Sequence, residues 1–598
     1  MSPSLNTPRV LFVALAIFGA NPCRTAESIP AATPASQGLA AAAQAQSGPD
    51  IAGTWHGTAK TPAGEVTLVL HVERGADAAL SAKLENASQS PGNLAPIAEI
   101  KLSAGHLTFR MARGNAYYEG DWDGGAQQWK GTLTQGRALA LNLAKGAPAP
   151  WQLPADTDIA GLIAARNAPR ARQGIVVGVL GPEGQRVVAG GPGAGAAFDR
   201  RTLFEIGSIS KVFTALLLAD MVNKGEVALD DPAAKYLPPG QKMPERNGRP
   251  ITLRHLATHR SGLPRMADDM RAVHDPDGPF ADYDEKRLLA FLGRCQLTRD
   301  PDSEWEYSNL GAGLLGYLLA RAAGTDYETL LRERVTRPLR MNDTTITLSP
   351  AHAAQHAPAF DAYMRPVKRW DFAILAGAGG IRSNADDMLT FASAVLDSKS
   401  SIAPAVKTML SVRIPSKDPQ VLQGLAWEIF QAAPGRELLR HSGQTGGFRA
   451  MLVLEPTKGR AVVALANTAA EPSTVDLALH VLTGRPVAPT PAVPPAPPAP
   501  TQHIEIALPV TQLEKFVGRY DFGSRIIIVI RREGAILRAQ REGVAGAPAL
   551  QIFPEAPLAF FWKTLDAQIR FTTDTNGAVT GAELSQGGRL MPGKRITP

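Results

Sequence analysis

The sequence predicts a chain of three domains, in which a central α/β domain lies between two small all-β domains. Three observations support this organisation. Strand and helix patterns alternate over residues 153–484, whereas short runs of alternating apolar and polar residues dominate residues 49–152 and 504–598. A segment rich in Pro and Ala separates the last two regions at residues 485–503. A chain of 598 residues is also too long for one ordinary core, so two to four domains are expected.

The N-terminus has the features of a secretory signal peptide over residues 1–26. Arg9 supplies a positive charge, and the apolar run Val10–Ala20 is too short to span a bilayer. Cleavage is expected after this run, at Ala26 or nearby, and an uncleaved anchor is the alternative. Lipidation of Cys23 is disfavoured, because the residues before it are not the small ones that a lipidated cysteine requires. The protein is therefore predicted to be exported, as a periplasmic or secreted protein.

The next segment, residues 27–48, is rich in Ala, Gln, Ser and Pro without a period, which predicts a flexible linker. Apolar and polar residues then alternate in Val66–Val72 and again in Leu107–Met111, and Gly-rich turns separate such runs. Residues 49–152 are thus predicted to form an antiparallel β domain. Its core is expected to contain the tryptophans Trp55, Trp122 and Trp129.

Strand pairs at both ends of residues 153–484 enclose helical segments. Gly174–Leu180 and Gln185–Gly190 have the pattern of one hairpin, and Met451–Leu454 and Ala461–Ala466 that of a second strand pair. Between them, apolar residues recur at helical spacing, as in Val212, Phe213, Leu216, Leu217 and Met221. We therefore expect one α/β domain whose sheet is closed by its terminal segments.

The C-terminal part begins with the linker at residues 485–503, whose composition predicts an extended polyproline spacer rather than a docking motif. Beyond it, Ile526–Arg531 and Ile536–Gln540 are strand-like, which predicts a second β domain over residues 504–598. The two flanking domains open similarly, with Gly-Thr-Trp at 53–55 and Gly-Arg-Tyr at 518–520. They are expected to be two related, small, lipocalin-like barrels.

The charge pattern limits the partners. The formal net charge of +7 is small for this length, and no dense Lys/Arg run or basic patch interleaved with aromatic residues occurs, so no nucleic-acid partner is expected. The mild positive charge is compatible with association with an anionic cell wall. A contribution of this charge to solubility alone is the simpler explanation for it. Past residue 20, no apolar run is long enough for a membrane helix. The oligomeric state is not fixed by the sequence.

Metal and disulfide chemistry have little support. Cys23 and Cys295 are the only cysteines, and removal of the signal leaves Cys295 alone. His255 and His259 have a spacing that metal ligands can use, but no H-E-x-x-H pattern occurs, so structural histidines are the preferred interpretation. Neither a metal nor a cofactor is expected.

The first segment that carries chemistry is Ser208-Ile209-Ser210-Lys211. A serine at a helix N-terminus faces the positive end of the helix dipole, and a lysine three residues later lies on the same face. A serine hydroxyl needs a base to become a nucleophile, and a lysine whose neutral form is favoured by burial can be that base. This pattern is weak by itself, because a solvated lysine on a helix is the more frequent case.

Two further segments strengthen the prediction that Ser208 and Lys211 form a catalytic pair. Tyr307-Ser308-Asn309 precedes the apolar helix expected over Leu310–Ala323; a tyrosine near a lysine ionises more readily and can relay a proton, and Asn309 can orient a substrate amide. The third segment, His441-Ser442-Gly443-Gln444-Thr445, leads into the strand at Met451. Small residues there allow a substrate backbone to lie against a strand edge, and the groups at its front can hold a carboxylate.

Together the segments resemble the S-x-x-K, Y-x-N and K-T-G or H-T-G motifs of the serine β-lactamase and penicillin-binding-protein superfamily, in the class C β-lactamase and DD-peptidase branch. Ile251–Pro264, Ala378–Ser383 and Gly424–Trp427 resemble further landmarks of that branch, and Pro238–Leu253 resembles its AmpH-like members. The resemblance covers residues 155–480. It implies a β-lactamase/transpeptidase-like fold, with an antiparallel sheet flanked by helices.

The resemblance also implies roles for the residues. Ser208 would be the acylated nucleophile, and Lys211 and Tyr307 would share the general acid and base work. Asn309 would bind the substrate amide. The backbone N–H groups of Ser208 and Gln444 would form the oxyanion hole. The carboxylate side of the substrate would be lined by His441, Ser442 and Thr445, with Gly443 between them.

His441 departs from the lysine typical of class C β-lactamases. A histidine is only partly charged near neutral pH, so it should anchor a carboxylate weakly and in a pH-dependent way. The sequence therefore predicts a serine hydrolase that acts on a β-lactam or a D-Ala-D-Ala-type amide, with a small-molecule or peptidoglycan-derived substrate. An esterase with the same Ser208 and Lys211 is one alternative. A penicillin- or cell-wall-binding protein that does not turn over is another.

Overall fold

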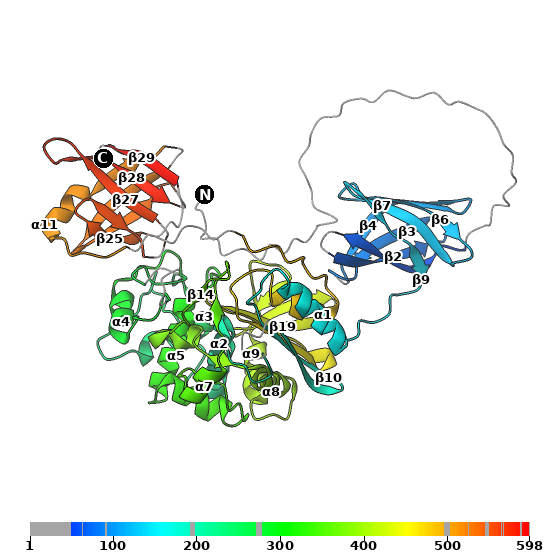
Figure 1. Cartoon of the computed structure of the whole chain (residues 1–598), viewed down its shortest axis with the longest axis horizontal. Coiled ribbons are helices and arrows are strands. Elements are labelled where there is room, and N and C mark those ends of the chain that lie inside the picture. Colours follow the sequence, from blue (N-terminus) through cyan, green and yellow to red (C-terminus); the bar gives the residue numbers. More distant parts are fainter. Residues whose placement is uncertain are drawn as a thin grey trace.

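The computed structural model describes residues 49–596, apart from 62–63, 90–91, 192–197, 271–277, 434, 495–502, 524–525, 544–548, 564, 566 and 587–588. The predicted signal peptide and the linker at 27–48 lie outside the described residues. Figure 1 shows a blue β domain, a cyan-to-yellow central domain and an orange-to-red β domain along the chain. Among the helices in the described part, none is long and apolar enough to cross a membrane.

The N-terminal domain is a β-sheet that closes on itself. Consecutive strands pair from β1 to β7, and β9 pairs with both β7 and β1, so the ladder returns to its first strand. Trp55 and Trp129 are fully buried in its core and Trp122 packs against them, as predicted. The strands are β1 (Gly53–Thr61), β2 (Gly64–Arg74), β3 (Leu80–Asn86), β4 (Leu94–Ser103), β5 (His106–Met111), β6 (Tyr117–Asp123), β7 (Gln128–Thr134), β8 (Ala138–Ala140) and β9 (Leu143–Lys145).

The central domain is built on an eight-stranded antiparallel sheet of order β11-β10-β21-β20-β19-β18-β17-β16. The two ends of the domain meet in the sheet, because β10 pairs with β21, as the sequence predicts. The strands are β10 (Ile175–Gly181), β11 (Gly184–Gly190), β16 (Ile414–Pro415), β17 (Val421–Gln423), β18 (Glu428–Ala433), β19 (Arg436–Gln444), β20 (Arg449–Glu455) and β21 (Arg460–Ala466).

Helices cover both faces of this sheet (Figure 1). Ile175 and Val177 of β10 pack in one core with α1 (Asp156–Asn167) and α10 (Val475–Thr483), while Val176 packs in the other. That alternation is the period of a strand buried on both sides. The second core contains α2 (Ser210–Asn223), α3 (Leu253–Ala257), α4 (Glu285–Arg294), α5 (Asn309–Ala322), α6 (Tyr327–Leu331), α8 (Ala385–Leu396) and α9 (Ala403–Ser411).

Short elements complete the domain. They are α7 (Pro350–Gln355), the strand pairs β12 (Phe204–Glu205) with β15 (Arg382–Ser383) and β13 (Ala359–Phe360) with β14 (Pro366–Val367), and the helical turns η1 (Gly207–Ile209), η2 (Ala233–Tyr236), η3 (Arg332–Thr336), η4 (Ala373–Ala378) and η5 (Pro456–Lys458).

The C-terminal domain is a closed antiparallel barrel of eight strands, β22 to β29. The predicted strands at 526–531 and 536–540 correspond to β23 and β24. The elements are α11 (Val510–Leu513), η6 (Glu514–Phe516), β22 (Gly518–Asp521), β23 (Ile527–Glu533), β24 (Ile536–Arg541), β25 (Leu550–Ala556), β26 (Ala559–Phe561), β27 (Ala567–Thr573), β28 (Val579–Gln586) and β29 (Arg589–Ile596). The C-terminal domain is therefore a small closed barrel, while two related, lipocalin-like barrels at both ends of the chain stay a prediction.

Specific contacts join the domains. Arg538 of β24 forms a buried ion pair with Asp268 of the central domain, which also pairs with Arg294. The start of the predicted spacer is not free, because the Arg485 guanidinium donates to the Gln89 carbonyl at 2.8 Å and lies over the Phe430 ring. The polyproline linker thus begins as a packed segment.

A very close approach of two backbones holds η1 against β19. A Cβ on Gly443 would lie 1.9 Å from the carbonyl oxygen of Ile206, and one on Gly207 would lie 2.6 Å from the Gln444 nitrogen. Gly207 also has φ +51, which favours glycine. Only glycine fits at these two positions, so the segment that carries Ser208 is fixed beside the end of β19.

We predict that Gly443→Ala destabilises the protein by about 1–3 kcal/mol, because the added methyl group must push two backbones apart. Urea unfolding followed by circular dichroism measures this. Gly161→Ala is the matched control: a Cβ at Gly161 in α1 meets nothing within 4 Å, and the change should stabilise the helix by about 0.5–1 kcal/mol. Equal stability of Gly443→Ala and the wild type would contradict the close approach.

Candidate active site

Ser208 and Lys211 lie side by side at the start of the buried helix α2. Ser208 is the middle residue of η1 and is partly exposed, whereas Lys211 is 2% exposed. The Lys211 Nζ lies 3.0 Å from the Ser208 Oγ. The structure therefore brings the two side chains together, and their roles as nucleophile and base stay a prediction.

Three acceptors surround the Lys211 amine. Nζ donates to the Asn309 Oδ1 at 2.9 Å and to the Ala378 carbonyl at 2.6 Å, in addition to its contact with Ser208. Burial, assisted by the positive charge of Arg265, holds the pKa of Lys211 well below its usual value. A neutral amine keeps two N–H donors for Asn309 and Ala378. Its lone pair can then accept the hydroxyl proton of Ser208.

Tyr307 lies beside both Ser208 and Lys211 and forms a side-chain hydrogen bond with Ser208. Its ring centroid lies 4.8 Å from the Lys211 Nζ and 5.0 Å from the Arg265 Cζ. Burial nevertheless raises the pKa of Tyr307 to about 12, against the opposing effects of Ser208 and Arg265. The expectation that Tyr307 ionises more readily beside a lysine is wrong for the resting site: the phenol is neutral and is a proton donor.

Asn309 is the first residue of α5, which Ser308 caps by accepting the Gly311 N–H at 2.8 Å. The backbone N–H of Asn309 donates to the Arg265 carbonyl at 3.0 Å. Because the Asn309 Oδ1 accepts from Lys211, its amide NH₂ is the group left to face a substrate carbonyl. This arrangement is compatible with the predicted role of Asn309.

The third motif lies at the end of β19, beside a strand edge. β18 pairs with β19 only from Arg436 to Arg440, whereas β20 follows β19 as far as Gln444. Ser442 and Gln444 are exposed, and His441 and Gly443 are buried. Gly207, which precedes Ser208, packs against the Gln444 backbone, so the two residues predicted to supply the oxyanion hole lie on segments in contact, and the oxyanion hole itself stays a prediction.

His441 differs from the expectation of a partly charged group. It is 4% exposed, and burial lowers its pKa to about 4, against the attraction of Glu428. Its Nδ1–H donates to the Ser442 carbonyl at 2.7 Å. His441 is therefore neutral near neutral pH and provides no fixed positive charge for a carboxylate.

Thr445 does not line the cleft as predicted. It is 1% exposed and lies beside the buried carboxyl group of Glu205, and its Oγ1 has no hydrogen-bond partner among the described residues. Glu205 is held by the Trp370 N–H at 2.8 Å. Thr445 therefore belongs to the support behind the strand rather than to the surface that a substrate would meet.

Three neighbours of the site were not predicted as site residues from the sequence. Arg265 follows the Ile251–Pro264 stretch, and Ala378 opens the 378–383 stretch, so adjacency to these landmarks was the available signal. His259 is buried, its Nδ1 accepts the Ser308 N–H at 3.2 Å, and its ring centroid lies 4.4 Å from that of Tyr307.

His259 is thus a structural histidine, as preferred from the sequence. His255, the other histidine of the pair considered as metal ligands, accepts the Thr252 N–H at 3.2 Å through its Nδ1. Within the described residues, no three His, Cys, Asp or Glu side chains are grouped to hold a metal ion.

Comparison with known proteins gives consistent results. Residues 159–484 match the family described as Beta-lactamase. The chain is 33% identical over 282 residues to the D-alanyl-D-alanine-carboxypeptidase/endopeptidase AmpH of Escherichia coli (strain K12), covering 45% of this chain and 71% of the relative. It is 28% identical over 320 residues to a Beta-lactamase of the same strain, covering 47% and 80%.

Among solved structures, a Beta-lactamase/D-alanine Carboxypeptidase from Yersinia pestis, complexed with citrate, matches with a TM-score of 0.47 and 23% identity, covering 55% of this chain and 97% of that one. The family match spans more than half of the chain and contains all three motifs. The chain therefore belongs to the beta-lactamase family.

Proposed function

We propose that this protein is an exported serine hydrolase that forms an acyl-enzyme on Ser208, with a D-Ala-D-Ala-type peptide as its preferred substrate and β-lactams as related substrates. The observation that carries the proposal is the buried Lys211 amine, whose pKa is held well below its usual value, 3.0 Å from the Ser208 hydroxyl. Similarity to the carboxypeptidase AmpH favours the peptide. Export rests on the pattern of residues 1–26, and N-terminal sequencing of the mature protein tests it.

Each residue has a defined task in this reaction. Lys211 takes the hydroxyl proton as the Ser208 Oγ attacks the scissile carbonyl carbon, and two backbone N–H groups bind the oxyanion. The neutral Tyr307 phenol gives its proton to the leaving amine as the C–N bond breaks. The Lys211 ammonium then returns a proton to Tyr307. In deacylation, a water molecule attacks the acyl carbonyl carbon as Lys211 takes its proton; the bond between this carbon and the Ser208 Oγ then breaks, and Lys211 returns the proton to the Oγ.

An esterase is the second candidate, and His441 is the observation that favours it. Because the buried imidazole is neutral, the cleft lacks the fixed cation expected at this position for a substrate carboxylate. A small acyl ester needs no such anchor, and it would use the same Ser208 and Lys211. The exposed Ser442 hydroxyl is the remaining donor for a peptide carboxylate.

We predict that Ser208→Ala lowers kcat by about 10³-fold or more, because the nucleophile is lost. Purified protein should be offered nitrocefin, a p-nitrophenyl ester and a D-Ala-D-Ala peptide. Ser398→Ala, an exposed serine on another segment, is the matched control and should retain activity. Turnover of the ester alone would favour the esterase, and activity that survives in Ser208→Ala would refute the assigned nucleophile. Stable labelling by penicillin without turnover would favour a binding protein.

Arg265→Gln should shift the acidic limb of the kcat/KM profile to higher pH. The Arg265 charge lowers the pKa of Lys211, so its removal raises that pKa, and the neutral amine then requires a more alkaline solution. A pH series with the wild type and with Arg337→Gln, an exposed arginine outside the site, provides the comparison. An unchanged limb, or one at lower pH, would contradict the role of Lys211 as the base.

Tyr307→Phe should affect amides more than activated esters. The ring stays, but the proton for the leaving amine is lost, so kcat for the D-Ala-D-Ala peptide should fall by about 10²–10⁴-fold. A p-nitrophenolate leaving group needs no proton, so ester turnover should fall less. Equal losses on both substrates would show that Tyr307 is not the acid.

A further inference from the structure

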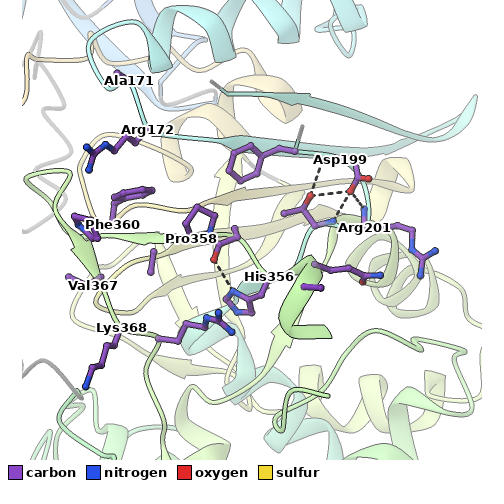
Figure 2. Close-up of a pocket in the computed structure, with 17 residues that line it drawn as sticks. Ala171, Arg172, Asp199, Arg201, His356, Pro358, Phe360, Val367 and Lys368 are labelled. Carbon is purple, nitrogen blue, oxygen red and sulfur yellow. Dashed lines mark hydrogen bonds between the residues drawn. The ribbon is translucent and has the colours of Figure 1, made fainter. Parts of the chain in front are cut away.

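A second cavity lies in the central domain, and Figure 2 shows its lining. Its volume is about 1090 Å³, which is enough for a small organic or peptide ligand. Four chain segments form it: Ala171–Arg172, residues 198–202, Ala354–Phe360 and Pro366–Arg369. Within the described residues, its lining does not include Ser208 or the other catalytic side chains.

Buried hydrogen bonds fix two of these walls relative to each other. The Asn467 side chain, which is fully buried, donates to the Pro358 carbonyl at 2.9 Å and to the Arg172 carbonyl at 3.4 Å. Its Oδ1 accepts the Gly174 N–H at 2.7 Å. The cavity is therefore held open by the fold rather than formed by loose surface loops.

The charges of the cavity are mostly positive and only partly compensated. Among the described residues, no carboxylate pairs with the guanidinium group of Arg172 or Arg369. Asp199 is the acidic residue of the lining, and its Oδ1 already accepts the N–H groups of Arg201 and Thr202 at 2.8 Å each. The Arg201 guanidinium pairs with Asp343, outside the cavity. The site is thus suited to an anion.

Two buried acceptors in the same lining have no hydrogen-bond partner in the part of the chain that the structure describes. The Gln355 Oε1 is buried without a hydrogen bond, and so is the Nε2 of His356. The Nδ1–H of His356 donates to the Ala357 carbonyl at 2.9 Å, and burial lowers its pKa to about 4, so Nε2 carries no proton near neutral pH. Leaving two acceptors unsatisfied is costly; because both atoms are buried, a ligand with N–H groups would satisfy them only after the two side chains turn toward the cavity.

We infer that this cavity binds an acidic peptide. A carboxylate would meet the guanidinium groups of Arg172 and Arg369, and peptide N–H groups would meet the Gln355 and His356 acceptors. The buried ring of Phe360, beside Val367 and Pro358, offers apolar contact for side chains (Figure 2). A phosphate ion would match the positive guanidinium groups, but it would match neither the buried acceptors nor the apolar ring of Phe360.

The cavity is next to the turn that follows the third motif of the central domain. A Cβ on Gly447, in the turn after β19, would lie 2.5 Å from the Ala359 Cβ and 2.9 Å from the Val367 Cγ2, and both residues line the cavity. Thr202, on another wall, precedes β12 and Ser208. A ligand here would therefore press on the two segments that form the cleft, without occupying it.

The test uses the full-length Ser208→Ala protein and isothermal titration calorimetry with acetyl-Ala-Glu-Ala-amide. Acetyl-Ala-Gln-Ala-amide and inorganic phosphate are the comparison ligands. We expect the Glu peptide to bind more tightly than either, and more weakly at high salt. The double variant Arg172→Gln/Arg369→Gln should raise the dissociation constant by about tenfold or more. Gln355→Met, which removes one acceptor, should also weaken binding.

Arg337→Gln, an exposed arginine that does not line the cavity, should leave the dissociation constant unchanged. Absence of binding, equal binding of the Gln peptide or of phosphate, or unchanged binding in the double variant would each overturn the inference. Because binding is measured without the nucleophile, these outcomes are independent of whether Ser208 hydrolyses a D-Ala-D-Ala peptide.

Discussion

The burial of one amine is the constraint on which the catalytic arrangement depends. Lys211 is enclosed by the core around α2, and the cost of burying its charge favours the neutral form. Its three polar contacts, with Ser208, Asn309 and Ala378, come from three different segments. The fold therefore supplies the base by placing an ionisable group where its charged form is unfavourable, and the surrounding acceptors orient its lone pair.

The close approach of two backbone segments also shapes the site. Gly207 and Gly443 let η1 and β19 approach more closely than any side chain would permit. This approach places the segment that carries Ser208 against Gln444, where the proposed oxyanion hole would form. The same turn region contacts the hairpin β13–β14 through Gly447, so the cleft and the second cavity share a wall.

Much of this organisation could be predicted from the sequence, since motifs and periodicity depend on local order. The three motifs, the helix after Tyr307 and the joining of β10 to β21 all correspond to local patterns. The pKa of His441 and that of Tyr307 could not be predicted, because both depend on burial by residues far along the chain. The orientation of Thr445 toward Glu205 is a tertiary contact as well. Arg265 was missed because its partner, Tyr307, is distant in sequence.

The most direct test of this account is the pKa of Lys211 itself. Protein containing ε-¹³C-labelled lysine can be titrated by NMR, with Lys211→Arg to assign the signal. The account predicts one lysine signal that titrates well below the value of 10.5 typical of lysine and that is absent from the variant. A Lys211 that titrates with the surface lysines, near 10.5, would contradict the claim that burial makes it the base of the reaction.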